Sequence, residues 1–158
     1  MNQRVVIVEV AGRLLYWVLL AASLWILLRG HNAPGGGFIG GLVAVSASVL
    51  YAVAFGSAAA LRRLPFGTAV RCLALGVLMS ALAGVPAWWT GDHFLTHLWG
   101  TLPLGFSEVK VSTVLVFDVG VYLCVWGALA GYALALLDLD EADEPNDAGG
   151  VGGEERAR

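Results

Sequence analysis

The chain has 158 residues, of which 58% are hydrophobic and only 13% are charged. An average soluble domain is about 25% charged, so this chain carries about half the charge that a soluble surface needs. The composition therefore argues against a soluble enzyme. Nucleic-acid binding is disfavoured as well, because Lys and Arg together number nine and form no basic stripe.

Four apolar stretches follow one another along the chain, over residues 5–28, 38–61, 69–89 and 111–137. Each is close to or above the ~20 residues that a transmembrane helix needs. We therefore predict an all-α membrane protein whose four transmembrane helices form one domain over residues 1–137. The first stretch is too long for a signal peptide and another apolar stretch follows it closely, so we expect it to be retained.

The ends of these stretches differ in positive charge. Arg4, Arg62 and Arg63 gather at one side, together with Arg71, whereas the other side has only Arg29 and Lys110. Cytoplasmic loops carry an excess of Lys and Arg. We therefore predict that both termini are cytoplasmic.

A glycine-rich segment separates the first two stretches. Its residues are His31, Asn32, Ala33, Pro34, Gly35, Gly36, Gly37, Phe38, Ile39, Gly40 and Gly41. It formally matches the dinucleotide fingerprint, but no strand precedes it and no acid follows about 20 residues on, so we predict no cofactor. Irregular backbone at membrane depth must be buried in protein or line water. The segment is therefore either a re-entrant turn packed on a partner or a simple tight turn.

Small residues recur at helical spacing in three of the stretches. The second stretch has such a row at Gly40, Ala44, Ser48, Ala52, Gly56 and Ala60, and the third has one at Cys72, Gly76, Ser80 and Gly84. The fourth has two rows, one at Gly127, Gly131 and Ala135 and one at Gly120, Cys124 and Ala128. Such faces let helix backbones approach closely in lipid. They serve either contacts with other chains or packing within this one. Cys72 and Cys124 are interpreted as small packing residues.

The segment before the fourth stretch contains several polar residues. His93 and His97 lack a third firm ligand, so no metal site is predicted. Asp92 is expected to cap a short interfacial helix that includes Phe94 and Leu95. Glu108 and Lys110 either line an outer ion entrance or anchor the fourth helix.

Asp118 is the strongest candidate for an ion-pathway residue. Of the four acids outside the tail, Glu9, Asp92 and Glu108 can reach an interface, which leaves Asp118 inside the membrane. An acid in a transmembrane segment is costly and is by default a functional hypothesis. The alternative is an Asp whose hydrogen bonds fix helix packing.

The last 21 residues differ from the rest of the chain. Residues 138–158 hold eight acids and two bases, a net charge of −6, whereas the preceding residues carry a net charge of +3. The segment has little to bury, so we expect a disordered acidic tail. It is either a docking segment or a solvated C-terminus.

Two motifs resemble one known family. The run from His31 to Leu42 and the run from Phe117 to Leu123 are similar to the signatures of the B subunits of multisubunit monovalent cation/proton antiporters of the Mrp or Mnh type. The resemblance covers about residues 5–137. It implies an accessory membrane subunit of a large sodium (or other monovalent cation)/proton antiporter complex in the bacterial inner membrane.

That resemblance leaves two functional hypotheses open. In the first, the chain contributes to ion translocation and to complex assembly, with the other antiporter subunits, the lipid bilayer, monovalent cations and protons as partners. In the second, it is a purely architectural helix-packing subunit. An intramembrane enzyme is disfavoured, because no catalytic constellation lies within the apolar stretches.

Overall fold

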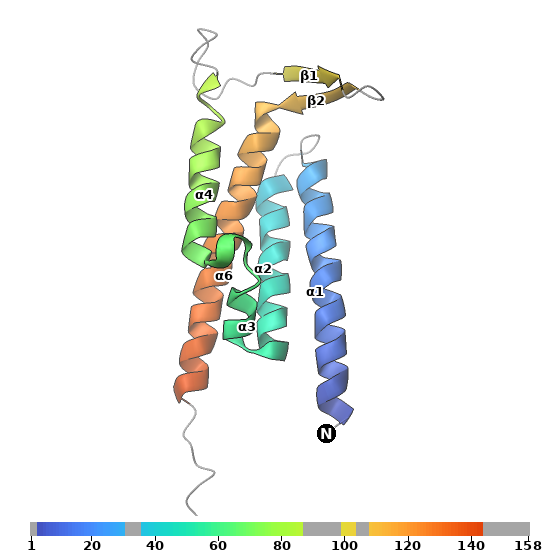
Figure 1. The fold of residues 1–158 in the computed structure, drawn as a ribbon, viewed down its shortest axis with the longest axis vertical. Coiled ribbons are helices and arrows are strands. Elements are labelled where there is room, and N and C mark those ends of the chain that lie inside the picture. The colour runs from blue at the N-terminus through green and yellow to red at the C-terminus, as the bar shows by residue number, and fades with distance from the viewer. Residues whose placement is uncertain (1–2, 31–35, 87–98, 104–107, 144–158) are drawn as a thin grey trace, which may run out of the picture.

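A computed structural model describes residues 3–30, 36–86, 99–103 and 108–143 of the chain. In chain order its elements are α1 (Gln3–Arg29), α2 (Gly36–Phe55), α3 (Ser57–Leu61), the 3-10 turn η1 (Pro65–Gly67), α4 (Ala69–Leu82), β1 (Trp99–Pro103), β2 (Glu108–Ser112) and α6 (Thr113–Asp143). The long helices run side by side, and the β1–β2 hairpin lies at one end of the bundle (Figure 1). The start of α1 and the end of α6 lie at the other end.

Three helices contain apolar stretches long enough to cross a membrane, over Ile7–Arg29, Gly36–Phe55 and Thr113–Leu139. The fourth apolar helix, α4, has 14 residues. At 1.5 Å per residue it rises about 21 Å, which is less than the ~30 Å hydrocarbon core. The all-α, multi-span prediction therefore holds as three long apolar helices and one shorter helix.

The structure differs from the expected second helix, which was to run through residue 61. The helix ends at Phe55, because Gly56 has φ 87° and ψ 155°, a backbone region that is almost exclusive to glycine. The chain then turns back through α3 and η1. Within η1, Phe66 has a left-handed backbone with φ 61°. We call residues 56–68 the return segment. It ends at Thr68, whose hydroxyl oxygen caps α4 by accepting a hydrogen bond from the Arg71 backbone N–H at 3.2 Å.

The last helix also differs from its expected bounds. Residues 108–112, which include the start of the predicted helix, form β2 and pair antiparallel with β1, with Trp99 opposite Ser112. The helix begins at Thr113 and continues to Asp143, so residues 138–143 of the expected tail are helical. The expected interfacial helix near Asp92 falls mainly on residues 87–98, which lie outside the described residues, as does the remainder of the tail, 144–158.

The helices pack in a row, with α1 against α2, α2 against α6 and α6 against α4. The contact between α4 and α6 is built from their small-residue rows. A Cβ placed on Gly76 would lie 2.6 Å from the Gly120 carbonyl oxygen, and one placed on Gly131 would lie 2.6 Å from Cβ of Ala69. Real Cβ atoms do not approach this closely, so glycine permits the backbones to touch. The rows of α4 and α6 therefore face each other within this chain.

Candidate functional site

The first turn and a half of α2 is wedged between α1 and α6, and its four glycines divide between these neighbours. Gly36 and Gly40 face α1, where added Cβ atoms would lie 2.9 Å from the backbone nitrogen of Gly30 and 2.9 Å from the carbonyl oxygen of Ser23. Gly37 and Gly41 face α6. The pattern G-G-x-x-G-G thus forms two parallel small-residue rows, one for each neighbouring helix.

Contact with α6 is especially close at Gly37. A Cβ on Gly37 would overlap the backbone carbonyl of Asp118, and one on Gly41 would lie 2.9 Å from Cβ of Val125. Phe38, which lies between these glycines in sequence, is 52% exposed. The described glycines of the motif therefore make the helix contacts, whereas its aromatic side chain points outward. His31, Pro34 and Gly35 lie outside the described residues.

Asp118 lies in the second turn of α6 and is partly buried. It is five positions after Thr113, so it lies about 7.5 Å along the helix axis from the start of α6. Its neighbour Gly37 is the second residue of α2, so the positive end of the α2 dipole lies beside Asp118. The contact itself is made by the Asp118 backbone, and the dipole favours negative charge near this end of α2. Gly37 and Asp118, which are 81 positions apart in sequence, therefore meet at one point.

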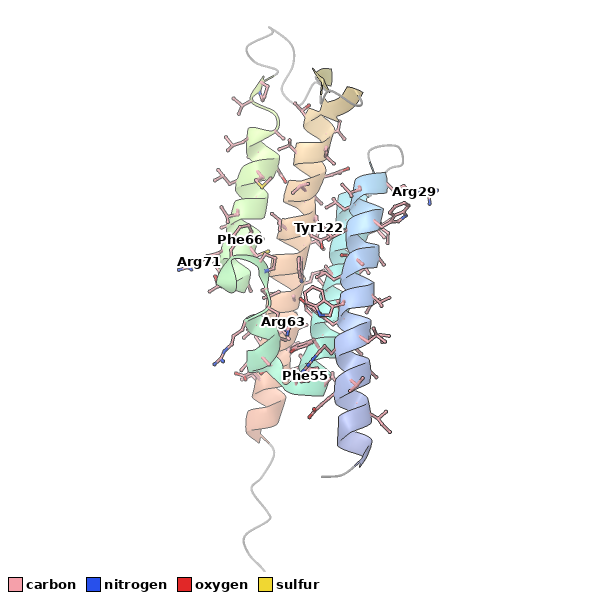
Figure 2. The ribbon with its side chains drawn as sticks, turned by 45° about the vertical axis from the view of Figure 1, so that its right-hand side comes forward. Arg29, Phe55, Arg63, Phe66, Arg71 and Tyr122 are labelled. Atoms are coloured by element: carbon pink, nitrogen blue, oxygen red, sulfur yellow. The ribbon has the colours of Figure 1, made fainter. Side chains whose placement is uncertain are left out.

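One turn beyond Asp118, a buried hydrogen bond joins α6 to α1. The hydroxyls of Tyr122 and Ser23 lie 3.0 Å apart, and Ser23 also donates to the carbonyl oxygen of Leu20 at 2.8 Å. A serine hydroxyl has one proton, so Tyr122 is the donor to Ser23. A proton passed along this pair would end on a backbone carbonyl. The pair therefore has a structural role, since it holds α6 against α1 (Tyr122 is labelled in Figure 2). We call such a buried interhelical hydrogen bond a pin.

A second buried hydrogen bond joins α6 to α2. The indole Nε1–H of Trp126 donates to Oγ of Ser48 at 2.8 Å, and Ser48 donates to the carbonyl oxygen of Ala44 at 3.1 Å. Within the described part of the chain, every buried side-chain nitrogen and oxygen has a hydrogen-bond partner. Buried polar groups that are fully paired rigidify a helix bundle. The two pins therefore fix α1 and α2 on α6 one and two turns beyond Asp118.

Glu108 and Lys110, the other two ion-pathway candidates, lie in β2. Glu108 is opposite Pro103 and Lys110 is opposite Thr101 in the hairpin. Their side chains lie outside what the structure describes. The hairpin continues directly into α6, so these two residues lie at the end of the bundle where Asp118 is found.

The described residues contain no cluster of three or more His, Cys, Asp or Glu side chains that would hold a metal ion. Cys72 and Cys124 are free thiols, and the Cys72 thiol lies 3.4 Å from the carbonyl oxygen of Leu123. Both cysteines lie at the contact between α4 and α6.

Several contacts were not anticipated from the sequence. Asp138, which was assigned to the tail, accepts a hydrogen bond from Ser57 at 2.9 Å and so ties α3 to α6. Arg63 lies over the ring of Tyr51, with its Cζ atom 4.7 Å from the ring centroid. The double glycine row at residues 36–41 was legible as a pattern, because both pairs have the four-residue spacing of a helix face. The two hydrogen-bonded pins gave no such signal.

Comparison with known families shows to which family the chain belongs. Residues 7–131 match the family described as "Domain related to MnhB subunit of Na+/H+ antiporter". The chain belongs to the MnhB family. This confirms the resemblance inferred from the two motifs, and it places the chain among transporter subunits rather than enzymes.

The chain aligns with curated MnhB relatives over most of its own length and most of theirs. The chain is 37% identical over 122 residues to the B subunit of the Na(+)/H(+) antiporter of Bacillus subtilis, and the match covers 77% of this chain and 85% of the relative. It is 32% identical over 137 residues to the protein of the same name from Alkalihalophilus pseudofirmus, and here the match covers 85% of this chain and 94% of the relative.

A solved structure shares the fold. A chain in "Structure of Mrp complex from Dietzia sp. DQ12-45-1b" aligns with a TM-score of 0.70 and 35% sequence identity, over 90% of the MnhB-family chain and 15% of the Dietzia chain. The MnhB-family chain therefore corresponds to one small section of that much longer polypeptide.

Proposed function

We propose that this chain is the B subunit of a multisubunit Na+/H+ antiporter in the bacterial inner membrane, and that it takes part in ion movement at Asp118. The first half of the proposal is supported by the names of the relatives, which are antiporter B subunits, and by the fold shared with a section of an Mrp complex. The relatives' names specify sodium and protons as the exchanged ions.

One contact supports the second half of the proposal. The Gly37 backbone lies against the Asp118 backbone, so an acid in an apolar helix is held beside the positive end of α2. A carboxyl group in this position is able to take up and release a proton or to coordinate a monovalent cation. Its place near one end of α6 suits an entrance or exit better than the middle of a pathway.

The alternative is a purely architectural role in the complex. It is favoured by the small-residue rows and by the two hydrogen-bonded pins, because all of these serve packing between helices. In this alternative Asp118 contributes to helix packing and carries no ion.

Replacing Asp118 by Asn distinguishes the two functions, because Asn is nearly isosteric but carries no titratable proton. In the complete antiporter complex, we expect Asp118→Asn to lower Na+-dependent H+ exchange about tenfold or more, equivalent to about 1.4 kcal/mol, with unchanged co-purification of the other subunits. Exchange is measured in everted membrane vesicles with a fluorescent pH indicator.

A second acid on the same helix provides the matched control. Asp138→Asn retains an acceptor for Ser57, so exchange and assembly should remain near those of the unmodified complex. If Asp118→Asn assembles and exchanges ions normally, Asp118 is not part of the pathway. If it prevents assembly, the architectural function is favoured.

A further inference from the structure

Helix α4 begins near the middle of the membrane-spanning layer. The apolar stretch Thr113–Leu139 of α6 is centred on residue 126. Ala69, the first residue of α4, contacts α6 at Gly127 and Gly131, where added Cβ atoms would lie 2.8 Å and 2.6 Å from it. At 1.5 Å per residue these contacts lie within about 8 Å of the centre of the stretch.

Helix α2 gives the same level independently. Its 20 residues rise about 30 Å, which is the thickness of the hydrocarbon core. Gly41 contacts Val125 of α6 and lies about 7 Å before the centre of α2. Because α2 and α6 run in the same direction, the centre of α2 is level with the stretch of α6 that contains Gly127 and Gly131 (Figure 1).

The residues that surround this level on the α4 side are exposed. They are Phe66, Gly67, Thr68 and Arg71, and we call this set the arginine face. The Phe66 side chain is 52% exposed. Its backbone is in the left-handed region, which a bulky residue rarely adopts. Arg71 points away from the bundle (Figure 2). Among the residues that the structure describes, no carboxylate forms an ion pair with it.

Arg63, next to this face, shows the contrasting arrangement. Its guanidinium Cζ lies 4.7 Å from the ring centroid of Tyr51 and 5.6 Å from that of Tyr16. Aromatic faces stabilise a cation that is removed from water. Arg63 is exposed as Arg71 is, but its charge lies over aromatic faces, whereas among the described residues no aromatic face lies beside the Arg71 guanidinium.

Lipid tails cannot cover the arginine face. Irregular backbone at membrane depth needs protein or water beside it, since lipid offers no hydrogen-bond partners. Intramembrane arginines face a bundle interior or a water-filled cavity and pair with acidic groups or carbonyls. Part of this backbone is paired within the chain, because the Gly67 N–H donates to the carbonyl oxygen of Leu64 at 3.3 Å and the Thr68 carbonyl oxygen accepts from the Cys72 N–H at 3.1 Å, so the Arg71 charge is the stronger reason.

We propose that the arginine face binds a transmembrane segment of another subunit that places a carboxylate against Arg71. A carboxylate matches the planar guanidinium with two parallel hydrogen bonds. The inference rests on the proposed function only in that it requires a complex with other membrane subunits. The face is distinct from the Asp118 site, which lies on the other side of the α6 midpoint.

Photo-cross-linking in the assembled complex tests this directly. Benzoylphenylalanine at Phe66 is expected to form a covalent adduct with another subunit, within a segment that contains an Asp or Glu. The same probe at Tyr132, an exposed aromatic at similar depth on α6, controls for reactivity of the probe inside the membrane.

Charge reversal then tests the ion pair. Arg71→Glu should lower co-purification of the cross-linked subunit about thirtyfold or more, because it places two acids together. Arg71→Lys should weaken binding less than Arg71→Glu does, because it keeps the positive charge but loses the two parallel hydrogen bonds. Replacing the partner carboxylate by Lys or Arg should restore the Arg71→Glu complex.

Three results would overturn the inference. They are a Phe66 adduct with lipid alone, an intramolecular adduct with residues 144–158, and rapid labelling of Thr68→Cys by a membrane-impermeant thiol reagent, which would indicate a water-filled cavity. Labelling is measured in a chain whose Cys72 and Cys124 are replaced by Ala. A chain that purifies without any other subunit contradicts the proposed function itself, whereas an intact complex in which Phe66 cross-links to no other chain contradicts only this inference.

Discussion

The absence of a side chain at Gly37 allows α2 to approach α6 closely. A methyl group in its place would overlap the Asp118 carbonyl, and the obstacle is backbone, which cannot move aside as a flexible side chain would. We expect Gly37→Ala to destabilise the bundle by about 1–3 kcal/mol, the usual cost of overpacking. The measurement is resistance to unfolding by SDS, followed by the yield of assembled complex.

The matched control for Gly37→Ala is Ala22→Val, which adds a larger group at an exposed position of α1. It should leave SDS resistance unchanged. Equal stability of both variants would mean that α2 and α6 are farther apart than the Gly37–Asp118 contact requires.

At this scale the sequence predicted which residues matter better than it predicted what they touch. The glycine motif and Asp118 were both singled out from local pattern. Their contact was not predictable, because it depends on how two helices 80 residues apart are packed. Asp138 was misassigned because charge density rises there, although helical backbone tolerates Asp and Glu and the apolar stretch of α6 reaches Leu139.

At the scale of helices, the hydrogen bond between the Ser23 and Tyr122 hydroxyls joins α1 to α6. We expect Ser23→Ala and Tyr122→Phe each to destabilise the bundle, with a coupling of about 0.6 kcal/mol, typical of such bonds in membranes. The double variant should therefore be less destabilised than the sum of the two. A double-mutant cycle of SDS unfolding free energies measures the coupling.

Ser46→Ala is the control for that cycle, because Ser46 is exposed and bonds only to Leu42 of its own helix, at 3.1 Å. It should show no coupling with Tyr122→Phe. A coupling near zero for the Ser23 pair as well would show that the two hydroxyls are not bonded in the membrane.

The end of α2 rests on the conformation of Gly56. Its φ of 87° and ψ of 155° are open to glycine but not to residues with a Cβ. No atom lies within 4 Å of the position of an added Cβ, so a substitution tests conformation without a steric clash. We expect Gly56→Ala to cost about 1–3 kcal/mol of unfolding free energy. SDS unfolding of the purified complex provides the measurement.

Asn tests the conformational argument further. Asn tolerates the ordinary left-handed helical region but not the more extended region of Gly56, so Gly56→Asn should be as destabilising as Gly56→Ala. Normal stability of either variant would mean that α2 continues past Phe55. Sequence pattern alone predicted such a continuation, because the apolar run extends through Leu61 and a glycine within it has the spacing of a packing row.

Over the described part of the molecule, glycine rows lie at the helix contacts beside a core that also buries large side chains such as Tyr122 and Trp126, and many large apolar side chains face outward. The glycine rows of α2, α4 and α6 are used within the chain, whereas the outer surface exposes side chains such as Val70 (74%) and Tyr132 (67%). Sequence alone left open whether these rows meet another chain, since small faces look alike in either case. The membrane character of the helices followed from length and apolarity, which do not depend on packing, whereas the expected four spans appear in the described residues as three long apolar helices and one of 14 residues.

Both ends of the described chain lie at one end of the bundle, so they share one side of the membrane (Figure 1). The sequence bias of Arg4, Arg62 and Arg63 over Arg29 and Lys110 predicts that this side is the cytoplasm, and Arg71, which lies near mid-depth, does not contribute to it. A green fluorescent protein fused after residue 158 should therefore fluoresce, and alkaline phosphatase fused there should be inactive. A tag inserted at residues 104–107, between β1 and β2, should be accessible from outside. Active phosphatase at the C-terminus would reverse the orientation.

The shortness of α4 has a consequence for how the protein is made. The ribosome synthesises α4 before α6, yet 14 residues are too few to hold a helix across the bilayer unaided. The backbone contacts that seat it, at Gly76, Gly127 and Gly131, exist only once α6 has been inserted. We therefore expect α4 to complete its insertion into the membrane late, after α6 has been inserted and provides the surface against which α4 packs.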